Sequence, residues 1–294
     1  MNPWDDIRQT ITAATGVPFK LAARHGVGGG CINAAWVIEG EGRRYFVKIN
    51  EAASLPMFEA EAEGLRELAR ADAVRVPEPV CSGVAGGSAF LVLEHLSFGH
   101  GGAQAAAHLG EQLAQLHRAT APQYGWRRDN AIGATLQVND WTGEWIAFWR
   151  KHRLGFQLDL AARKGCPARL RDEGERLLEV FPQMFQGYAP VPSLLHGDLW
   201  SGNADYDESG IPVLFDPAVY YGDREADLAM TELFGGFPPD FYAAYRRNWP
   251  LDPGYAARRT LYNLYHILNH FNLFGGGYAA QAQRMIAALL AETR

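Results

Sequence analysis

Apolar and polar residues follow two different patterns along the chain. In the first third, short apolar runs separated by turn residues indicate strands at residues 18–23, 34–38, 45–49 and 89–96. The stretch from Pro56 to Arg70 instead spaces Met57, Leu65 and Leu68 as on one face of a helix. The N-terminal third is therefore expected to be rich in strands, with one clear helix.

The pattern changes where an apolar run gives way to glycine, at Ser97-Phe98-Gly99-His100-Gly101-Gly102. Beyond this point helical patterns dominate. We predict an α+β, bilobal fold in which residues 1–96 form a strand-rich N-terminal lobe and residues 97–294 form a mainly helical C-terminal lobe.

Two short apolar runs interrupt the helical half, and each ends in polar residues. Residues 191–195 lead into His196-Gly197-Asp198-Leu199-Trp200-Ser201-Gly202-Asn203. Residues 211–215 lead into Asp216-Pro217, and Asp207-Glu208-Ser209-Gly210 between the two runs is typical of a turn. The predicted arrangement is a loop, then a hairpin, then a carboxylate at the exit of the hairpin, with Asn203 and Asp216 converging on one ion.

Asp198, Asn203 and Asp216 have the chemistry that phosphoryl transfer requires, because that reaction depends on alignment and charge neutralisation. Asp198 is expected beside an acceptor hydroxyl, which its carboxylate would orient. The side-chain oxygens of Asn203 and Asp216 suit Mg²⁺ bound to nucleotide phosphates. When either fragment is taken alone, the better explanation is that its residues merely form a turn. The two fragments in this order favour a kinase-like phosphotransferase.

A glycine-rich stretch, residues 24–33, lies between the first two predicted strands. Gly28, Gly29 and Gly30 would let backbone N–H groups approach the phosphates of ATP closely. Cys31 takes the last position of a Gly-x-Gly-x-x-Gly pattern and no helix follows, which disfavours a dinucleotide-binding fold. Taken alone, a plain hairpin turn explains this stretch about as well.

Lys48 strengthens the nucleotide interpretation, since a lysine within an apolar strand needs a partner. We predict that Glu61, on the helix at residues 56–70, pairs with Lys48 and aims it at the α- and β-phosphates. Glu59 and Glu63 are expected to form a solvated acidic face of the same helix.

The crossing between the lobes offers a further nucleotide contact. Backbone groups near Glu94 and Leu96 are candidates for binding the adenine edge, although backbone recognition leaves little trace in a sequence.

Length and charge narrow the possible classes of protein. The 294 residues suffice for two lobes, and the net charge of −6 argues against a nucleic-acid binder. No apolar run is long enough for a bilayer, and the N-terminal residues lack the features of a signal peptide. Three scattered cysteines indicate neither a disulfide framework nor a zinc site, so a cytoplasmic location is expected. The oligomeric state stays open.

The motifs resemble those of the fructosamine/ketosamine-3-kinase family, from the glycine loop almost to the C-terminus. The His-Gly-Asp and Asp-Pro elements are shared with aminoglycoside phosphotransferases and choline kinases. Two longer runs are narrower and favour the ketosamine kinases: Leu-Trp-Ser-Gly-Asn at residues 199–203 and Asp-Pro-Ala-Val-Tyr-Tyr-Gly-Asp-Arg-Glu at residues 216–225. Residues 28–33, Lys48 and residues 273–278 fit the same family.

The resemblance implies a protein-kinase-like fold and ATP-dependent phosphorylation of the 3-hydroxyl of a ketosamine, either a small molecule or a protein-bound lysine adduct. The 3-phosphate is unstable and releases the amine, so the implied role is deglycation, or protein repair. Carried over by position, Asp198 is the catalytic base, Asn203 and Asp216 are metal ligands, and Lys48 and Glu61 position the phosphates. The resemblance also suggests that Cys31 forms a disulfide between chains as a redox switch, against the alternative of a small residue that fits the loop.

Several neighbouring residues carry predictions of their own. His196 is expected to brace the catalytic loop, and Asp227 to accept hydrogen bonds from the backbone of that loop. Trp200 could pack against a sugar ring or in the core. Asp223, Arg224 and Glu225 could touch substrate or form an internal ion pair. Packing rather than metal binding or substrate contact is preferred for Trp141, Trp145, Phe148, Trp149, Tyr262, Tyr265, His266, Asn269 and His270.

Two other functions stay open at this stage. One is a small-molecule kinase for an aminoglycoside, choline or another hydroxylated amine. The other is a nucleotide-binding pseudokinase that serves as an interaction module, against which the complete set of Lys48, Asp198, Asn203 and Asp216 argues.

Overall fold

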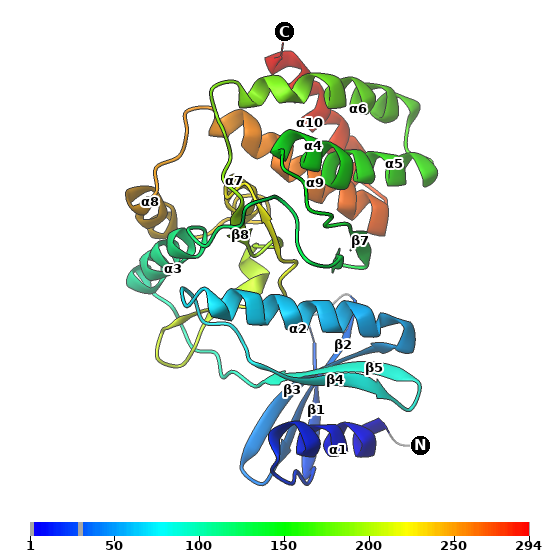
Figure 1. The fold of residues 1–294 in the computed structure, drawn as a ribbon, viewed down its shortest axis with the longest axis vertical. Helices are drawn as coiled ribbons and strands as arrows, with labels where there is room; N and C mark the ends of the chain where they lie inside the picture. The colour runs from blue at the N-terminus through cyan, green and yellow to red at the C-terminus, as the bar shows by residue number, and fades with distance from the viewer. Residues whose placement is uncertain (1–2, 29–31, 294) are drawn as a thin grey trace.

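The N-terminal lobe is built on an antiparallel sheet of five strands in the order β1-β2-β3-β5-β4 (Figure 1). The computed structural model describes residues 3–28 and 32–293. The elements of this lobe are, in chain order, α1 (Pro3–Thr15), β1 (Ala23–Val27), β2 (Ala34–Gly40), β3 (Arg43–Glu51), the 3₁₀-helix η1 (Ala52–Ser54), α2 (Leu55–Arg70), β4 (Pro79–Ala85) and β5 (Ser88–Glu94).

Tight turns set the register of this sheet. Glu41 and Gly42, which join β2 to β3, both have positive φ (52° and 75°), and so do Gly86 and Gly87 between β4 and β5 (57° and 84°). Two consecutive residues with positive φ make the turn whose twist matches that of paired strands. Glycine tolerates this conformation without steric cost, which explains its presence in both turns.

The two faces of the sheet have different neighbours. On β3, Tyr45 and Val47 pack with α1 in a small core on the outer face. The alternate positions of the strand, Phe46 and Lys48, point to the opposite face, where α2 lies. Figure 1 shows α2 between the sheet and the C-terminal lobe, so this helix is covered on two sides.

Most predicted elements of this lobe are present, and one is misplaced. The strand predicted at residues 18–23 overlaps β1 (Ala23–Val27) at a single residue. β1 is an edge strand with four of its five residues exposed, so it does not need the apolar pattern on which the prediction relied. The helix α1 and the strand β4 were not predicted.

The C-terminal lobe is mainly helical, as predicted. Its elements are α3 (Ala103–Leu116), β6 (Asn130–Ile132), β7 (Thr135–Gln137), α4 (Trp145–Trp149), the π-helix η2 (Arg150–Leu154), α5 (Gly155–Arg163), α6 (Ala168–Val180), η3 (Phe181–Phe185), β8 (Ser193–Leu195), η4 (Ser201–Asn203), β9 (Ala204–Tyr206), β10 (Pro212–Leu214), β11 (Tyr220–Gly222), α7 (Glu225–Thr231), α8 (Pro239–Asn248), α9 (Tyr255–Phe274) and α10 (Tyr278–Glu292).

The core of this lobe surrounds α9, and the aromatic residues predicted to pack do so with one exception. Trp145, Phe148 and Trp149 are buried next to Tyr262 of α9. Trp141 is not on the helix and is 43% exposed, because the chain is still extended there and the helix begins only at Trp145.

The segment at residues 97–102 joins β5 to α3, at the predicted crossing between the lobes. The boundary at residue 96 stays a prediction. Among the described residues, no helix combines the length and the apolar character needed to cross a bilayer.

Candidate active site

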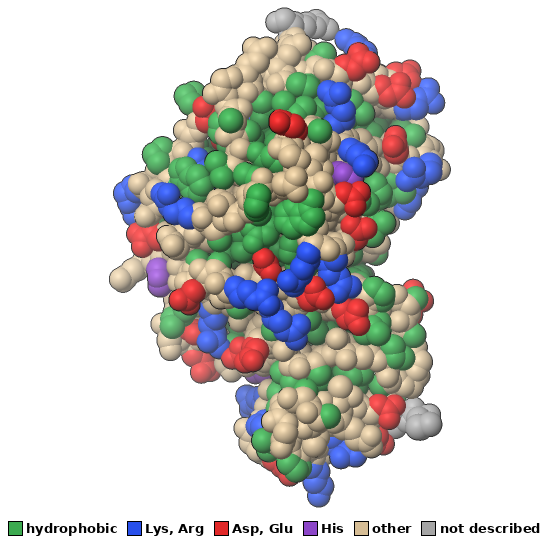
Figure 2. All heavy atoms as spheres, in the orientation of Figure 1, with side chains coloured by type: hydrophobic (Ala, Val, Ile, Leu, Met, Phe, Trp, Pro, Cys, Tyr) green, Lys and Arg blue, Asp and Glu red, His purple; other side chains and the backbone are tan. Residues whose placement is uncertain are grey.

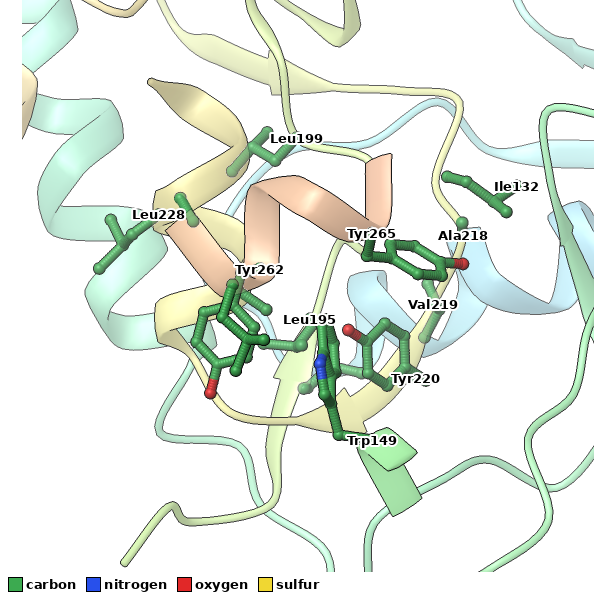
Figure 3. Packing of buried hydrophobic residues seen from close by; sticks show 14 of the residues in the cluster. Ile132, Trp149, Leu195, Leu199, Ala218, Val219, Tyr220, Leu228, Tyr262 and Tyr265 are labelled. Atoms are coloured by element: carbon green, nitrogen blue, oxygen red, sulfur yellow. The ribbon is translucent and has the colours of Figure 1, made fainter. Parts of the chain in front are cut away.

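The His-Gly-Asp segment is held in place by buried leucines on both sides. Leu195 ends β8 and Leu199 follows Asp198, and both side chains point into the core (Figure 3). β8 pairs with β11, which fixes the start of the loop. Gly197 has φ +83°, and a Cβ at this position would lie 2.0 Å from the carbonyl oxygen of Ala218. The loop therefore requires glycine here.

Asp227, at the start of α7, accepts hydrogen bonds from the backbone of the loop. Its carboxylate receives the N–H groups of His196 (2.7 Å) and Gly197 (2.9 Å). The predicted contact is therefore present. Burial alone would raise the pKa of Asp227, but the hydrogen bonds and nearby histidines, His117 first among them, outweigh it and lower the pKa.

His117, which directly follows α3, extends this support, and it was not predicted from the sequence. Its Nε2 lies 3.2 Å from Asp227, and its Nδ1 lies 2.8 Å from the hydroxyl of Tyr245 on α8. Burial lowers the pKa of His117, so the ring is neutral and can donate through one nitrogen while accepting through the other. Helices α3, α7 and α8 are thereby tied to the loop.

His196 braces the loop from within, as predicted. Its Nε2 lies 2.9 Å from the carbonyl oxygen of Phe215, and the N–H of Asp198 lies 3.3 Å from its Nδ1. Burial lowers the pKa of His196, which makes proton transfer by this ring at neutral pH unfavourable. The geometry supports a positioning role.

Asp198 is partly buried and faces Asn203. The side-chain amide of Asn203 donates to the carbonyl oxygen of Asp198 (2.9 Å) and to its carboxylate (3.2 Å). Burial, followed by the negative charge of Asp216, raises the pKa of Asp198 to about 7. A carboxylate with a pKa near neutrality is a competent acceptor for a hydroxyl proton.

Asn203 and Asp216 are brought together by their backbones, since the N–H of Phe215 donates to the carbonyl oxygen of Asn203 (3.1 Å). Asp216 has φ +56°, a conformation uncommon for residues other than glycine. Its side chain is about half exposed. The carboxylate of Asp216 and the side-chain amide oxygen of Asn203 are hard oxygen donors of the kind that Mg²⁺ prefers.

Within residues 3–28 and 32–293 no three His, Cys, Asp or Glu side chains form a group able to hold a metal. Proteins commonly hold Mg²⁺ with one or two carboxylates together with substrate phosphates and water, so a Mg²⁺ site does not require such a group.

Lys48 crosses from the N-terminal lobe to these carboxylates. Its Nζ lies 2.6 Å from Glu61 on α2 and 2.5 Å from Asp216. Burial alone would lower the pKa of Lys48, but the charges of Asp216 and Glu61 outweigh it and raise the pKa. The predicted ion pair of Lys48 and Glu61 is present, and the roles of both residues toward ATP stay predictions.

Glu59 and Glu63 do not form the solvated face that was expected. Glu63 accepts from Arg128 (2.7 Å) and Arg127 (3.1 Å), and Glu59 lies 3.6 Å from Arg128. The prediction failed because the two arginines belong to the C-terminal lobe, more than 60 residues further along the chain.

The remaining predicted nucleotide contacts are the glycine-rich stretch, Glu94 and Leu96. Gly28 is exposed just after β1, whereas Gly29, Gly30 and Cys31 lie outside the described residues, so the redox role of Cys31 stays a prediction. Glu94 ends β5, its N–H donates to the carbonyl oxygen of Glu78 (2.8 Å), and its carboxylate pairs with Arg75 (2.6 Å). Leu96 follows the strand in the segment that joins the lobes.

Trp200 is 37% exposed, and its ring meets Phe234 edge-on with 6.3 Å between centroids. The side chain is therefore not part of the core. Its contact with a sugar ring stays a prediction.

Asp223, Arg224 and Glu225 are buried away from solvent. Glu225 forms an ion pair with Arg258 of α9 (2.7 Å), and Asp223 accepts from the hydroxyls of Tyr188 and Tyr262. An internal structural role, one of the two alternatives, is what the geometry supports.

The hairpin of β6 and β7 supports the segment after Asp216, which the sequence analysis did not foresee. Asn130 donates to the carbonyl oxygen of Val219 (2.8 Å), and Gln137 donates to that of Ala218 (3.1 Å). Figure 3 shows Ala218, Val219 and Tyr220 beside Tyr265 of α9. Isolated amides in a sequence give no signal for contacts of this kind.

Comparison with known proteins agrees with this geometry. The fructosamine kinase family model matches residues 3–292. The Synechocystis protein that carries the name Probable ketoamine kinase is 50% identical over 290 residues, covering 98% of this chain and 97% of its own length. The protein-ribulosamine 3-kinase of Oryza sativa subsp. japonica, named chloroplastic, is 43% identical over 96% of this chain and 82% of its own.

Solved structures share the architecture. A Haemophilus somnus 129PT protein assigned to the fructosamine-3-kinases superposes with a TM-score of 0.90 at 32% identity, covering 98% of this chain and 97% of its own. An aminoglycoside phosphotransferase in complex with ADP and hygromycin B gives 0.66 at 16% identity, covering 97% and 98%. The second likeness shows the fold alone, and it confirms the predicted protein-kinase-like architecture. With a family model spanning nearly every residue and relatives above 40% identity, the chain belongs to the fructosamine kinase family.

Proposed function

We propose that this protein is an ATP-dependent kinase that phosphorylates the 3-hydroxyl of a ketosamine. The observation that carries the proposal is the convergence of Lys48, from the N-terminal lobe, on Asp216, whose charge also acts on Asp198. The closeness of this cation to two carboxylates between the lobes supports phosphate binding by Lys48, metal binding by Asp216 and base catalysis by Asp198. The name of the rice relative, protein-ribulosamine 3-kinase, supports the choice of acceptor.

Each side chain has a defined task in this proposal. Lys48, aligned by Glu61, binds nucleotide phosphates, and Asp198 orients the acceptor hydroxyl and accepts its proton. Asn203 and Asp216 would hold Mg²⁺, which supplies neutralisation of phosphate charge when bound. Asp227 and His196 keep the loop in the required geometry through the hydrogen bonds described above.

The proposal extends to the role and location of the enzyme. A 3-phosphate on a ketosamine promotes release of the amine, so the product leads to deglycation of a small molecule or a protein lysine. We place the protein in the cytoplasm, a reducing compartment that suits the free thiols of Cys81 and Cys166.

The test is ATP consumption with Mg²⁺ against ribuloselysine, fructoselysine, choline and kanamycin, with Asp198→Asn as the blank. We expect turnover on a ketosamine that yields the 3-phosphate, and loss of at least two orders of magnitude in the variant. The variant should still fold and bind nucleotide. Turnover only on choline or kanamycin would assign a different acceptor, and binding of ATP without any turnover would favour a pseudokinase.

A further inference from the structure

Helix α2 carries charged residues on two opposite faces, and each face has a separate partner. Glu61 points inward to Lys48. Glu59, Glu63 and Glu67 are spaced by four residues and form one stripe on the other side, because two residues turn a helix by about 200°. Contacts on the side of α2 that carries Glu59, Glu63 and Glu67 can therefore also affect the position of Glu61.

The outer stripe is bound by the C-terminal lobe. Glu63 accepts from Arg128 and Arg127 at 2.7 and 3.1 Å, and Arg127 lies 3.6 Å from Glu67. We call Glu59, Glu63, Glu67, Arg127 and Arg128 the interlobe clamp. Figure 2 shows basic and acidic side chains gathered over the junction between the lobes.

Two further contacts bring α2 close to the catalytic lobe. The hydroxyl of Tyr221 on β11 donates to Glu67 (2.8 Å). A Cβ on Gly64 would lie 3.1 Å from Cγ2 of Val219, so the backbone of α2 packs against the segment that follows Asp216. This packing thus links Glu61, on α2, to the segment that follows Asp216 in the C-terminal lobe.

We propose that Arg127 and Arg128 are positioning residues for the phosphotransfer reaction, which act through α2 to hold Glu61 against Lys48. This inference rests on the proposed function. Single exposed ion pairs contribute little to stability, but several pairs on one helix face can bias where that helix lies. The ion pairs of the two arginines are with Glu59, Glu63 and Glu67 of α2, so the proposed effect passes through this helix to Glu61.

The test is a double-mutant cycle between the clamp and Glu61. Arg127→Gln/Arg128→Gln should lower kcat/KM for ATP about tenfold, with the melting temperature nearly unchanged, and Arg128→Lys should retain most of the activity. In a Glu61→Gln background the same double substitution should have no further effect, because the position of α2 no longer matters. Arg169→Gln, which removes an exposed pair with Glu173 on α6, is the matched control.

A second readout separates this inference from the proposed function. Calorimetric titration with ADP and Mg²⁺ should show the same loss and the same non-additivity without any acceptor. If no ketosamine is phosphorylated but this coupling is present, the inference holds and the proposed function fails. If the double variant matches the Arg169→Gln control, or loses as much in the Glu61→Gln background as in the wild type, the inference is wrong.

Discussion

At the scale of single residues, His266 shows how burial alone sets a protonation state. The side chain lies on α9, packed edge-on against Tyr265 with 5.1 Å between centroids. Burial, and then the proximity of His270, lowers the pKa of His266 to about 3. The ring is therefore neutral at every pH at which the protein is expected to work.

This state predicts a defined effect of acid on stability. Between pH 6.5 and about 3 the unfolded chain protonates His266 whereas the folded chain does not, so the free energy of unfolding falls as the pH falls. His266→Asn should remove this contribution. The difference in unfolding free energy between wild type and variant should shrink by about 1.4 kcal/mol per pH unit below pH 6. Urea titrations at pH 7, 6 and 5 measure it, and parallel pH profiles would contradict it.

Sequence reasoning located residues whose chemistry is unusual for their surroundings. A lysine in an apolar strand, and an Asp and an Asn five positions apart, are visible in the chain itself. His117 and Tyr245 were missed because their roles depend on a partner more than 100 residues away. Glu63 was misassigned for the same reason: a glutamate on a helix face looks solvated until the opposing arginine is known.

At the scale of elements, α3 and α8 pack so closely that their contact depends on one glycine. A Cβ on Gly110 of α3 would lie 2.2 Å from the carbonyl oxygen of Phe241 on α8. His117 directly follows α3, and Tyr245 lies on α8. Their separation therefore affects the support of the catalytic loop.

We expect Gly110→Ala to destabilise the fold despite the better helix propensity of alanine. The gain of about 1 kcal/mol from propensity is smaller than the cost of separating two packed helices, typically 1–3 kcal/mol. The net loss should reach about 2 kcal/mol, measured by denaturant unfolding. Gly102→Ala, before the start of α3, has nothing within 4 Å of its Cβ and serves as the control. Equal stability of the two variants would refute the packing argument.

Elements with a strong internal pattern were the ones that could be predicted. The helix expected at residues 56–70 corresponds to α2 (Leu55–Arg70), and the strand at residues 45–49 is contained in β3 (Arg43–Glu51). β1 was misplaced because an exposed edge strand has no apolar face. Short strands such as β6 and β7 exist through tertiary contacts and leave no periodicity to detect.

At the scale of the whole molecule, the main hydrophobic core extends across both lobes. Phe58 and Leu65 of α2 and Leu91 of β5 belong to the same cluster of contacts as Trp149 and Tyr262 in the C-terminal lobe. A second, smaller core lies under α1 on the outer face of the sheet. The two lobes thus share one hydrophobic core.

A shared interior predicts cooperative unfolding. Differential scanning calorimetry should give a single transition whose calorimetric and van't Hoff enthalpies agree, since neither lobe can lose its packing alone. Two resolved peaks would show that the lobes unfold independently.

The shared interior also limits how the protein could be recombined with its relatives. A chimera joined at the linker after β5 would place α2 from one parent against Val219 and the arginines of another, and so would divide the core between two sets of side chains. A chimera that exchanges only α1, whose partners lie on the outer face of the sheet, would leave that core intact. The modular unit of this chain is therefore smaller than a lobe, and the best place to exchange sequence lies on the side of the sheet away from the C-terminal lobe.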